Sequence, residues 1–223
     1  MTPRGTTWAT VLSALAATAC LTYTEVTLPG QTLISDYALV PGGMTPVLIG
    51  MLALAAACLF LAYGLAAREA ARTAATRVLL LATAAGLMLS ALFPTDPAFS
   101  EVNSLGGEIH RWSAAVVFTA LPVAGWTLAR AREVLPRWNL VRAVSLTSGL
   151  TLAAYLAAHP GSFVSSLING GAYYGLLERG LVLSEIGLIV VMALTSARAR
   201  PVAAAAVAEP GRRSERSERR LAA

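Results

Sequence analysis

Residues 45–66 read TPVLIGMLALAAACLFLAYGLA and contain no charged side chain. An α-helix rises 1.5 Å per residue, so about 20 apolar residues are enough to cross the hydrocarbon core of a bilayer. This stretch predicts a transmembrane helix. Because further runs of the same kind follow one another along the chain, it also sets the fold class.

Composition agrees with a membrane protein. Of the 223 residues, 56% are hydrophobic and 13% are charged, and the mean hydropathy is +0.64; soluble domains carry about a quarter charged residues. The predicted fold is all-α, one integral membrane domain over residues 1–200 that forms a bundle of six transmembrane helices. The expected spans are about 8–28, 45–66, 76–94, 112–130, 138–158 and 177–197.

The basic residues predict the orientation. All 17 are arginines, and fifteen would lie on one side of the bundle, leaving Arg111 and Arg179 on the other. By the positive-inside rule both termini are cytoplasmic (N-in/C-in). This asymmetry signals topology, so we expect no nucleic-acid partner; the partner is the lipid bilayer. The Ala-rich, all-Arg composition favours a bacterium and hence a bacterial cytoplasmic (plasma) membrane.

The C-terminal tail, the first span and the two cysteines lead to one further expectation each. Residues 201–223 form an Arg-rich tail of low apolar content, which we expect to be disordered. The stretch ALAATAC ending at Cys20 loosely resembles a cleavage site, but apolar residues continue to Leu28, so we expect the first span to remain uncleaved. Cys20 and Cys58 lie at different depths, which argues against a disulfide.

The ionisable residues outside the arginine-rich side form one set at the outer face. Its members are Glu25, Asp36, Asp96, Glu101, Glu108, His110, Arg111, His159, Glu178, Arg179 and Glu185. The outer half of the bundle is therefore predicted to contain a polar pocket. We also expect the connection 159–176 to fold back on the bundle, because it keeps several large apolar side chains.

Helical spacing places the deepest of these groups. Glu178 and Glu185 are seven residues apart, so they share one face of their helix about 10 Å apart along the axis. An ionisable group inside a span faces the bundle interior, a partner or water. Arg111 and Arg179 lie beside acids, and a guanidinium pairs well with a carboxylate. We expect them to neutralise some members of the set Asp36, Asp96, Glu108 and Glu178.

Several chemistries remain open for this pocket. Its candidate ligand-binding residues are Asp36, Asp96, Glu108, His110, Arg111, Glu178, Arg179 and Glu185, and the candidate catalytic residues are His110, Asp36, Asp96 and Glu185. A zinc hydrolase would need Asp36 and Asp96 to complete a site around His110, because the chain has only two histidines. A haem would have to be held by His110 and His159, which lie at outer helix ends, whereas haem ligands in membrane proteins usually lie inside the spans. A network of ion pairs that only fixes helix packing is the third alternative.

Four short motifs resemble one family when they are taken in order. They are ISDYALVPGG at 34–43, LFPTD at 92–96, GGEIHRWSA at 106–114 and GLLERG at 175–180. Together they resemble the bacterial membrane family called domain of unknown function 998, over most of residues 8–197. The resemblance implies a six-span membrane protein with Asp36, Asp96, His110 and Arg179 at motif positions. It implies no activity, because none is established for the family.

The leading functional hypothesis is that the pocket binds or moves a small polar or lipid-like ligand. In this hypothesis Arg111 and Arg179 hold an anionic group or the carboxylates, while His110 and Glu185 relay or accept a proton. The alternative is the metal-dependent membrane hydrolase that uses His110 with Asp36 and Asp96, and a non-catalytic membrane scaffold comes third.

Overall fold

The computed structural model describes residues 2–97, 104–130 and 132–198, and its long helices confirm the six predicted spans. In order these are α1 (Pro3–Thr27), α2 (Met44–Glu69), α3 (Ala74–Leu92), α4 (Leu105–Arg130), α5 (Pro136–Ala158) and α7 (Gly170–Ala197). Each is long and apolar enough to cross a membrane. Helices suit this environment because they satisfy the backbone N–H and C=O groups within one segment. Glu101 and the tail 201–223 lie outside the described residues.

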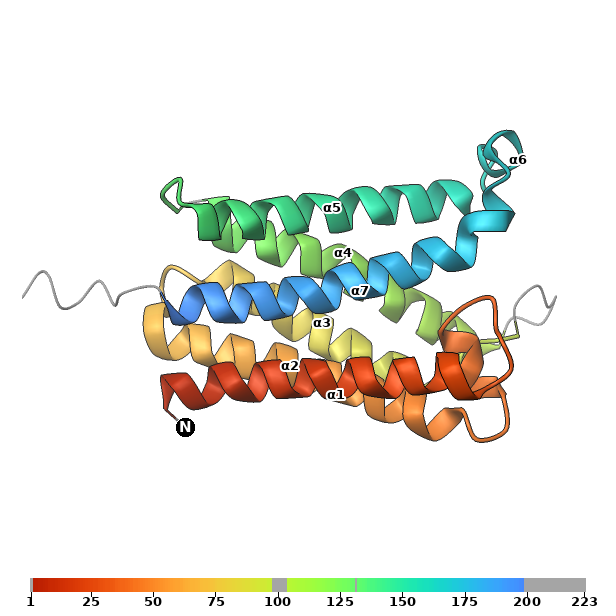
Figure 1. The fold of residues 1–223 in the computed structure, drawn as a ribbon, viewed down its shortest axis with the longest axis horizontal. Coiled ribbons are helices and arrows are strands. Elements are labelled where there is room, and N and C mark those ends of the chain that lie inside the picture. Colours follow the sequence, from red (N-terminus) through yellow and green to blue (C-terminus); the bar gives the residue numbers. More distant parts are fainter. Residues whose placement is uncertain (1, 98–103, 131, 199–223) are drawn as a thin grey trace, which may run out of the picture.

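The six long helices run along a common axis (Figure 1). α1 packs mainly on α2, α3 lies between α2 and α4, and α7 contacts α5, α1 and α4. Small residues permit close approach, as in other membrane bundles. A Cβ on Gly86 would lie 2.9 Å from the Ser113 carbonyl oxygen, and the Ser90 hydroxyl donates to the His110 carbonyl oxygen at 3.5 Å. Gly86 and Ser90 therefore form the small-residue face along which α3 meets α4.

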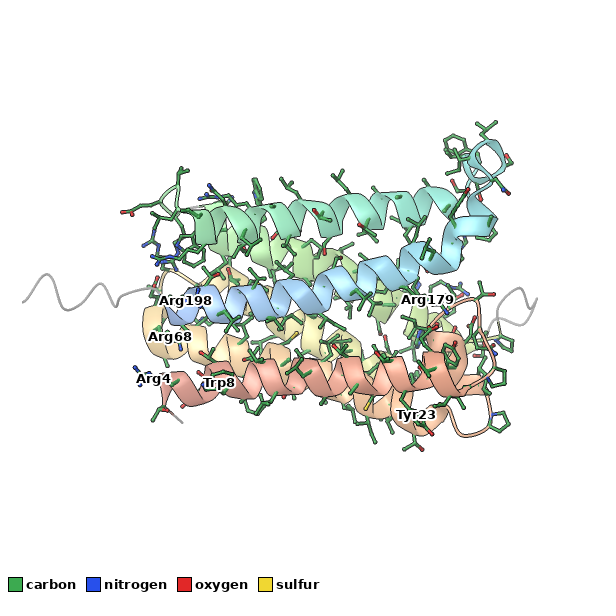
Figure 2. All side chains as sticks on the ribbon, viewed as in Figure 1. Arg4, Trp8, Tyr23, Arg68, Arg179 and Arg198 are labelled. Carbon is green, nitrogen blue, oxygen red and sulfur yellow. The ribbon has the colours of Figure 1, made fainter. Side chains whose placement is uncertain are left out.

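The two ends of the bundle differ in charge. Arg4, Arg68 and Arg198 lie at one end and Arg179 lies at the other (Figure 2). We call the first the arginine end; it also carries the α2–α3 and α4–α5 turns. The second carries the connections 28–43 and 159–169 together with residues 93–97 and 104, and we call it the pocket end.

The largest differences from the predicted spans are at the beginnings of α4 and α7. α4 begins at Leu105 rather than near residue 112, and α7 begins at Gly170 rather than near residue 177. In both cases the hydropathy pattern marked only the apolar part of the helix. The polar first turns continue the same helix because backbone hydrogen bonds, and not apolarity, define its ends. The sequence GGEIHRW thus lies within α4.

The predicted folding-back of the 159–176 connection is wrong for its middle part. The short helix α6 (Ser165–Ile168) projects from the bundle beyond the end of α5 (Figure 1). Phe163 is 87% exposed and Leu167 is 81% exposed. The Ser165 hydroxyl donates to the Ala158 carbonyl oxygen at 2.9 Å, which ties α6 to the end of α5 through small groups and leaves its large side chains outside. Asn169, with φ of 53°, then turns the chain into α7.

Candidate functional site: a polar cavity at the pocket end

A cavity of about 770 Å³ extends from the pocket end into the bundle. Its lining comes from every long helix and from the connections 32–36, 95–97 and 159–162. The exposed lining residues lie in two places: at the pocket end, with Arg111 and His159, and on the side of the bundle, with Ala115 and Thr119 of α4 and Leu156 of α5. Exposed lining residues thus border the cavity both at the pocket end and between α4 and α5. We infer an opening at each place and call the second one the lateral mouth.

Asp36 is the most distinctive acidic group of the lining. It lies in a 3₁₀ turn, η1 (Ser35–Leu39), and is only 5% exposed. Its Oδ2 accepts from the Leu33 backbone N–H at 3.2 Å, whereas its Oδ1 is buried without a hydrogen-bond partner. Burial raises the pKa of the Asp36 carboxyl, although the Leu33 N–H and the nearby His110 and Arg179 act in the opposite direction. An unsatisfied buried oxygen of this kind is costly, so it marks a place where a ligand or a proton can bind.

Glu178 of α7 holds the neighbouring part of the same connection. Its Oε2 accepts from the Ile34 backbone N–H at 2.6 Å, and the residue is 5% exposed. The charge of Asp36 also acts on Glu178. Two carboxyls from separate elements thus face one corner of the cavity.

Arg179 acts as a clamp on the connection that carries Asp36. Its Nε lies 2.9 Å from Glu25 Oε1, and its terminal nitrogens donate to the carbonyl oxygens of Thr32 (2.8 Å), Gln31 (2.9 Å) and Gly175 (3.0 Å). A Cβ on Gly175 would overlap the Thr32 carbonyl oxygen, so glycine lets the connection lie directly on α7. The Arg179 partner is Glu25, and the expectation that it neutralises Asp36, Asp96, Glu108 or Glu178 by a direct ion pair is wrong.

His110 joins α4 to the end of α3. Its Nδ1 lies 3.0 Å from both the Ser90 and the Phe93 carbonyl oxygens. Carbonyl oxygens only accept, so Nδ1 carries the proton and donates to both. Pro94 has no N–H, so the Ser90 carbonyl has no donor four residues later, and His110 supplies one. Nδ1 therefore has a structural task, and Nε2 is the ring nitrogen that remains for the cavity.

Asp96 chiefly supports Ser104, the residue that caps the first turn of α4. Its two oxygens accept from the Ser104 hydroxyl at 2.6 Å and the Ser104 N–H at 3.0 Å, and Ser104 Oγ in turn accepts from the Gly107 N–H at 2.9 Å. Both hydrogen bonds from Ser104 hold the pKa of Asp96 below its usual value. A Cβ on Gly107 would overlap the Asp96 carboxylate. This arrangement explains why glycine and aspartate occur together in the two adjoining motifs.

Glu185 is the deepest acid of the cavity. It lies about 22 Å along α7 from Gly170, is 2% exposed, and its Oε1 has no hydrogen-bond partner. The same face of α7 carries Tyr174 and Glu178, which also line the cavity. The acids therefore lie at graded depths along one helix, as their spacing predicted.

An aromatic wall faces these acids. Tyr155 of α5 stacks on Tyr174 of α7 with a centroid separation of 4.6 Å, and their hydroxyls lie 2.7 Å apart. Phe118 of α4 meets Tyr155 edge-on at 6.3 Å, and His159 meets Tyr174 edge-on at 5.4 Å. This wall was not predicted from the sequence. The spacing of Tyr174 four residues before Glu178 was the one available signal, but only the tertiary structure brings Tyr155 to it.

The two remaining members of the predicted set lie at the rim. Arg111 Nη1 pairs with Glu108 Oε1 at 2.8 Å, which confirms one of the expected neutralising pairs, and both side chains are substantially exposed. Both arginines of the pocket end thus already hold a carboxylate. Among the described residues, no three His, Cys, Asp or Glu side chains gather closely enough to hold a metal ion. His110, Asp36 and Asp96 are thus not brought together as a three-ligand metal site.

Six apolar helices around a partly open, mostly apolar cavity that contains a few polar groups define a multi-pass helical membrane protein. Within that class, the model of a family described as protein of unknown function (DUF998) matches residues 6–195, and the chain belongs to that family. This confirms the resemblance carried by the four motifs. Comparison with curated proteins and with solved structures gave no match.

Proposed function

We propose that this protein binds or moves a small amphiphilic ligand in the cavity, with the pocket end facing the outside of a bacterial cytoplasmic membrane. The observation that carries the proposal is the cavity itself. It combines buried, unpartnered carboxyl oxygens on Asp36 and Glu185 with a mouth on the lipid-facing side of the bundle. A purely structural network would not require about 770 Å³ of space beside its charges.

The lining suits a molecule with a polar and an apolar part. Leu54, Leu87 and Val182 contribute apolar surface, while Asp36, His110 and Glu178 contribute polar groups at the pocket end. Ligand pockets generally combine a mostly apolar wall with a few convergent polar groups. A chain-bearing ligand would place its polar group near Asp36 and extend its chain through the mouth between α4 and α5.

The orientation rests on the distribution of arginine. Among the described residues, nine of the eleven arginines lie at the arginine end, and the other two are Arg111 and Arg179. The positive-inside rule then places the arginine end and both termini in the cytoplasm. In this orientation the cavity is reached from the outer leaflet, and Glu185 accepts a proton deep inside it.

Photolabelling tests the proposed cavity. The purified protein in a maltoside detergent is illuminated with an octanol that carries a diazirine, and labelled peptides are mapped by mass spectrometry. We expect the labels to concentrate on the cavity-facing parts of α4, α5 and α7. Thr119→Phe, which narrows the lateral mouth, should reduce this labelling about tenfold if one well-placed obstruction removes most of the binding free energy.

Thr147→Phe is the matched control. Thr147 is an exposed residue of α5 outside the cavity lining, so the same substitution there adds the same bulk to the lipid-facing surface. It should leave the labelling unchanged. Labels spread evenly over the lipid-facing residues of all helices, with no effect of Thr119→Phe, would show that the cavity is not a binding site.

A further inference from the structure

The charges around the cavity do not balance, and the imbalance identifies a ligand class. Arg111 is paired with Glu108, and Arg179 is occupied by Glu25 and three backbone carbonyl oxygens. Within the described part of the chain, the lining acids Asp36, Glu178 and Glu185 have no ion pair with arginine. The charges of His110 and Arg179 act on Asp36, and that of Arg179 acts on Glu178, without an ion pair to either acid; His110 Nδ1 is committed to α3.

The unpartnered oxygens belong to the side chains that line the cavity. Asp36 Oδ1 and Glu185 Oε1 have no hydrogen-bond partner. Each residue is more than nine-tenths buried, so water does not readily replace the missing partner. A buried carboxylate is stable only when a donor or a positive charge compensates it. An anionic ligand would increase the imbalance, whereas a cation would remove it.

The aromatic wall favours the same kind of ligand. The stacked Tyr155 and Tyr174 rings border the cavity beside Glu178, and Phe118 extends the wall toward the lateral mouth. Aromatic faces attract cations through their quadrupole, and they bind quaternary ammonium groups in particular. The apolar part of the lining would accept the organic substituent of such a group.

We propose that the cavity recognises an amphiphile whose polar group is an organic ammonium, held by Asp36 and Glu178 against the Tyr155–Tyr174 pair. This inference rests on the proposed function, whose ligand class it specifies. Glu185 lies about 10 Å deeper along α7 than Glu178, which is too far for one small head group to contact both acids symmetrically. Glu185 is therefore a second acidic group, separate from the first binding position. It either attracts the cation deeper into the cavity or exchanges a proton when the cation binds.

Three probes that share one alkyl chain test the sign of the charge. Octyltrimethylammonium, octyl sulfate and octanol are titrated calorimetrically into the protein in maltoside detergent, with the same titration into protein-free micelles subtracted. We expect the ammonium to bind about tenfold or more tightly than the other two, because only its positive charge is attracted to the acids and to the aromatic wall. Equal or tighter binding of octyl sulfate would overturn the inference.

Isosteric substitutions assign the effect to the cavity. Asp36→Asn and Glu178→Gln keep an oxygen that can accept from Leu33 and Ile34, so the connection can still fold. Each should weaken octyltrimethylammonium binding about tenfold, while octanol binding changes little. Glu133→Gln is the matched control, because it removes one exposed acid at the arginine end and changes the net charge equally. If both cavity variants bind the ammonium as the parent protein does, the inference fails.

Two further measurements separate the sources of the ammonium group. Native mass spectrometry that finds an amine-headed phospholipid on the parent protein and none on Asp36→Asn would identify a lipid head group. Binding of added octyltrimethylammonium without a retained lipid would identify a free amphiphilic amine. Tetramethylammonium that binds as tightly as the octyl compound would overturn the requirement for a chain.

The inference and the proposed function can fail separately. If the photoreactive octanol labels the cavity and Thr119→Phe blocks it, but the three octyl probes bind equally, the cavity is a ligand site without charge preference. If the octanol does not label the cavity and no octyl probe binds, both are wrong.

Discussion

Glu185 places a carboxyl group near the middle of a membrane-spanning helix, where an apolar side chain would make the folded protein more stable. Its Oε1 has no hydrogen-bond partner and the residue is 2% exposed. Intramembrane acids of this kind are rare and face bundle interiors or functional pathways. Glu185 is therefore expected to lower the stability of the protein while serving its function, and a substitution at this residue should affect the two in opposite directions.

Glu185→Met should stabilise the protein and impair ligand exchange. Replacing an uncompensated buried carboxyl by an apolar side chain of similar length removes its desolvation cost, so we expect a gain of about 1 kcal/mol or more in the free energy of unfolding. Thermal unfolding in detergent measures this gain. Glu69→Met provides the contrast, because it leaves Arg132, which lies 2.7 Å from Glu69 and is mostly buried, without its partner. That variant should be less stable than the parent.

His110 should show the opposite behaviour to Glu185. His110→Leu removes the donor to the Ser90 and Phe93 carbonyl oxygens, and leaving buried acceptors unsatisfied costs about 1–3 kcal/mol. His110→Asn can place an amide N–H where Nδ1 now lies and should recover part of this loss. Thermal unfolding should therefore rank the parent above His110→Asn and His110→Asn above His110→Leu. Equal stability of the two variants would contradict the capping role.

The raised pKa of the Asp36 carboxyl predicts how the affinity for a cation depends on pH. Burial raises the pKa of its carboxyl in the free protein, so the carboxyl holds its proton to a higher pH than usual and the cation binds with release of that proton. The affinity for octyltrimethylammonium should rise with pH through this pKa and level off above it. The charged and titratable groups that face Asp36 are His110 of α4, Tyr155 of α5, and Tyr174, Glu178 and Arg179 of α7.

Calorimetric titrations at several pH values check this dependence. Asp36→Asn should bind weakly and lose the part of the slope that belongs to Asp36. Because His110 acts on Asp36, the series is repeated in His110→Asn to isolate the Asp36 contribution. An unchanged slope in Asp36→Asn would assign the pH dependence to another group.

At the scale of elements, the connection 28–43 depends on α7. Ile34 donates to Glu178, the Thr32 carbonyl accepts from Arg179, and Gly175 provides the space for that contact. The three residues of the GLLERG motif that bear on the site thus hold one connection in place. This connection positions Asp36 at the cavity.

Gly175→Ala should therefore displace the connection and destabilise the protein, by about 1–3 kcal/mol if a clash with the Thr32 carbonyl must be relieved by backbone movement. Gly187→Ala is the control, because a Cβ there meets nothing within 4 Å. Alanine is the better helix former, so that variant should keep or slightly raise the stability. Hydrogen exchange at Ile34 should accelerate in Gly175→Ala alone. Equal effects of the two substitutions would contradict the close approach of the connection to α7.

At the scale of the whole molecule, the charge asymmetry gives a direct test of topology. In a cysteine-free background with Cys20 and Cys58 replaced by alanine, Ser166→Cys on α6 and Glu133→Cys at the arginine end each provide one exposed thiol. A membrane-impermeant maleimide added to intact spheroplasts should label Ser166→Cys and should reach Glu133→Cys only after lysis. The reverse pattern would invert the proposed orientation and place the pocket end in the cytoplasm.

The sequence by itself determined the six spans, the separation of charge between the two ends, the family, and the placement of Glu178 and Glu185 on one helix face. These features follow from local regularities, because hydropathy, helical period and motif order can be counted along the chain. It also identified His110, Asp36 and Glu185 as candidates. It misplaced the first turns of α4 and α7, because polar residues can continue a helix beyond the hydrocarbon.

The Arg111–Glu108 pair was expected from the sequence, but only the tertiary structure decided the partners of the other charged groups at the pocket end. It paired Arg179 with Glu25, assigned Asp96 to the α4 cap, gave His110 Nδ1 to the end of α3, and left α6 outside the bundle. It also brought Tyr155 and Tyr174 together from two helices around one cavity. Such pairings depend on how helices far apart in sequence cross and how connections fold over them, and a local pattern carries no information about those distances.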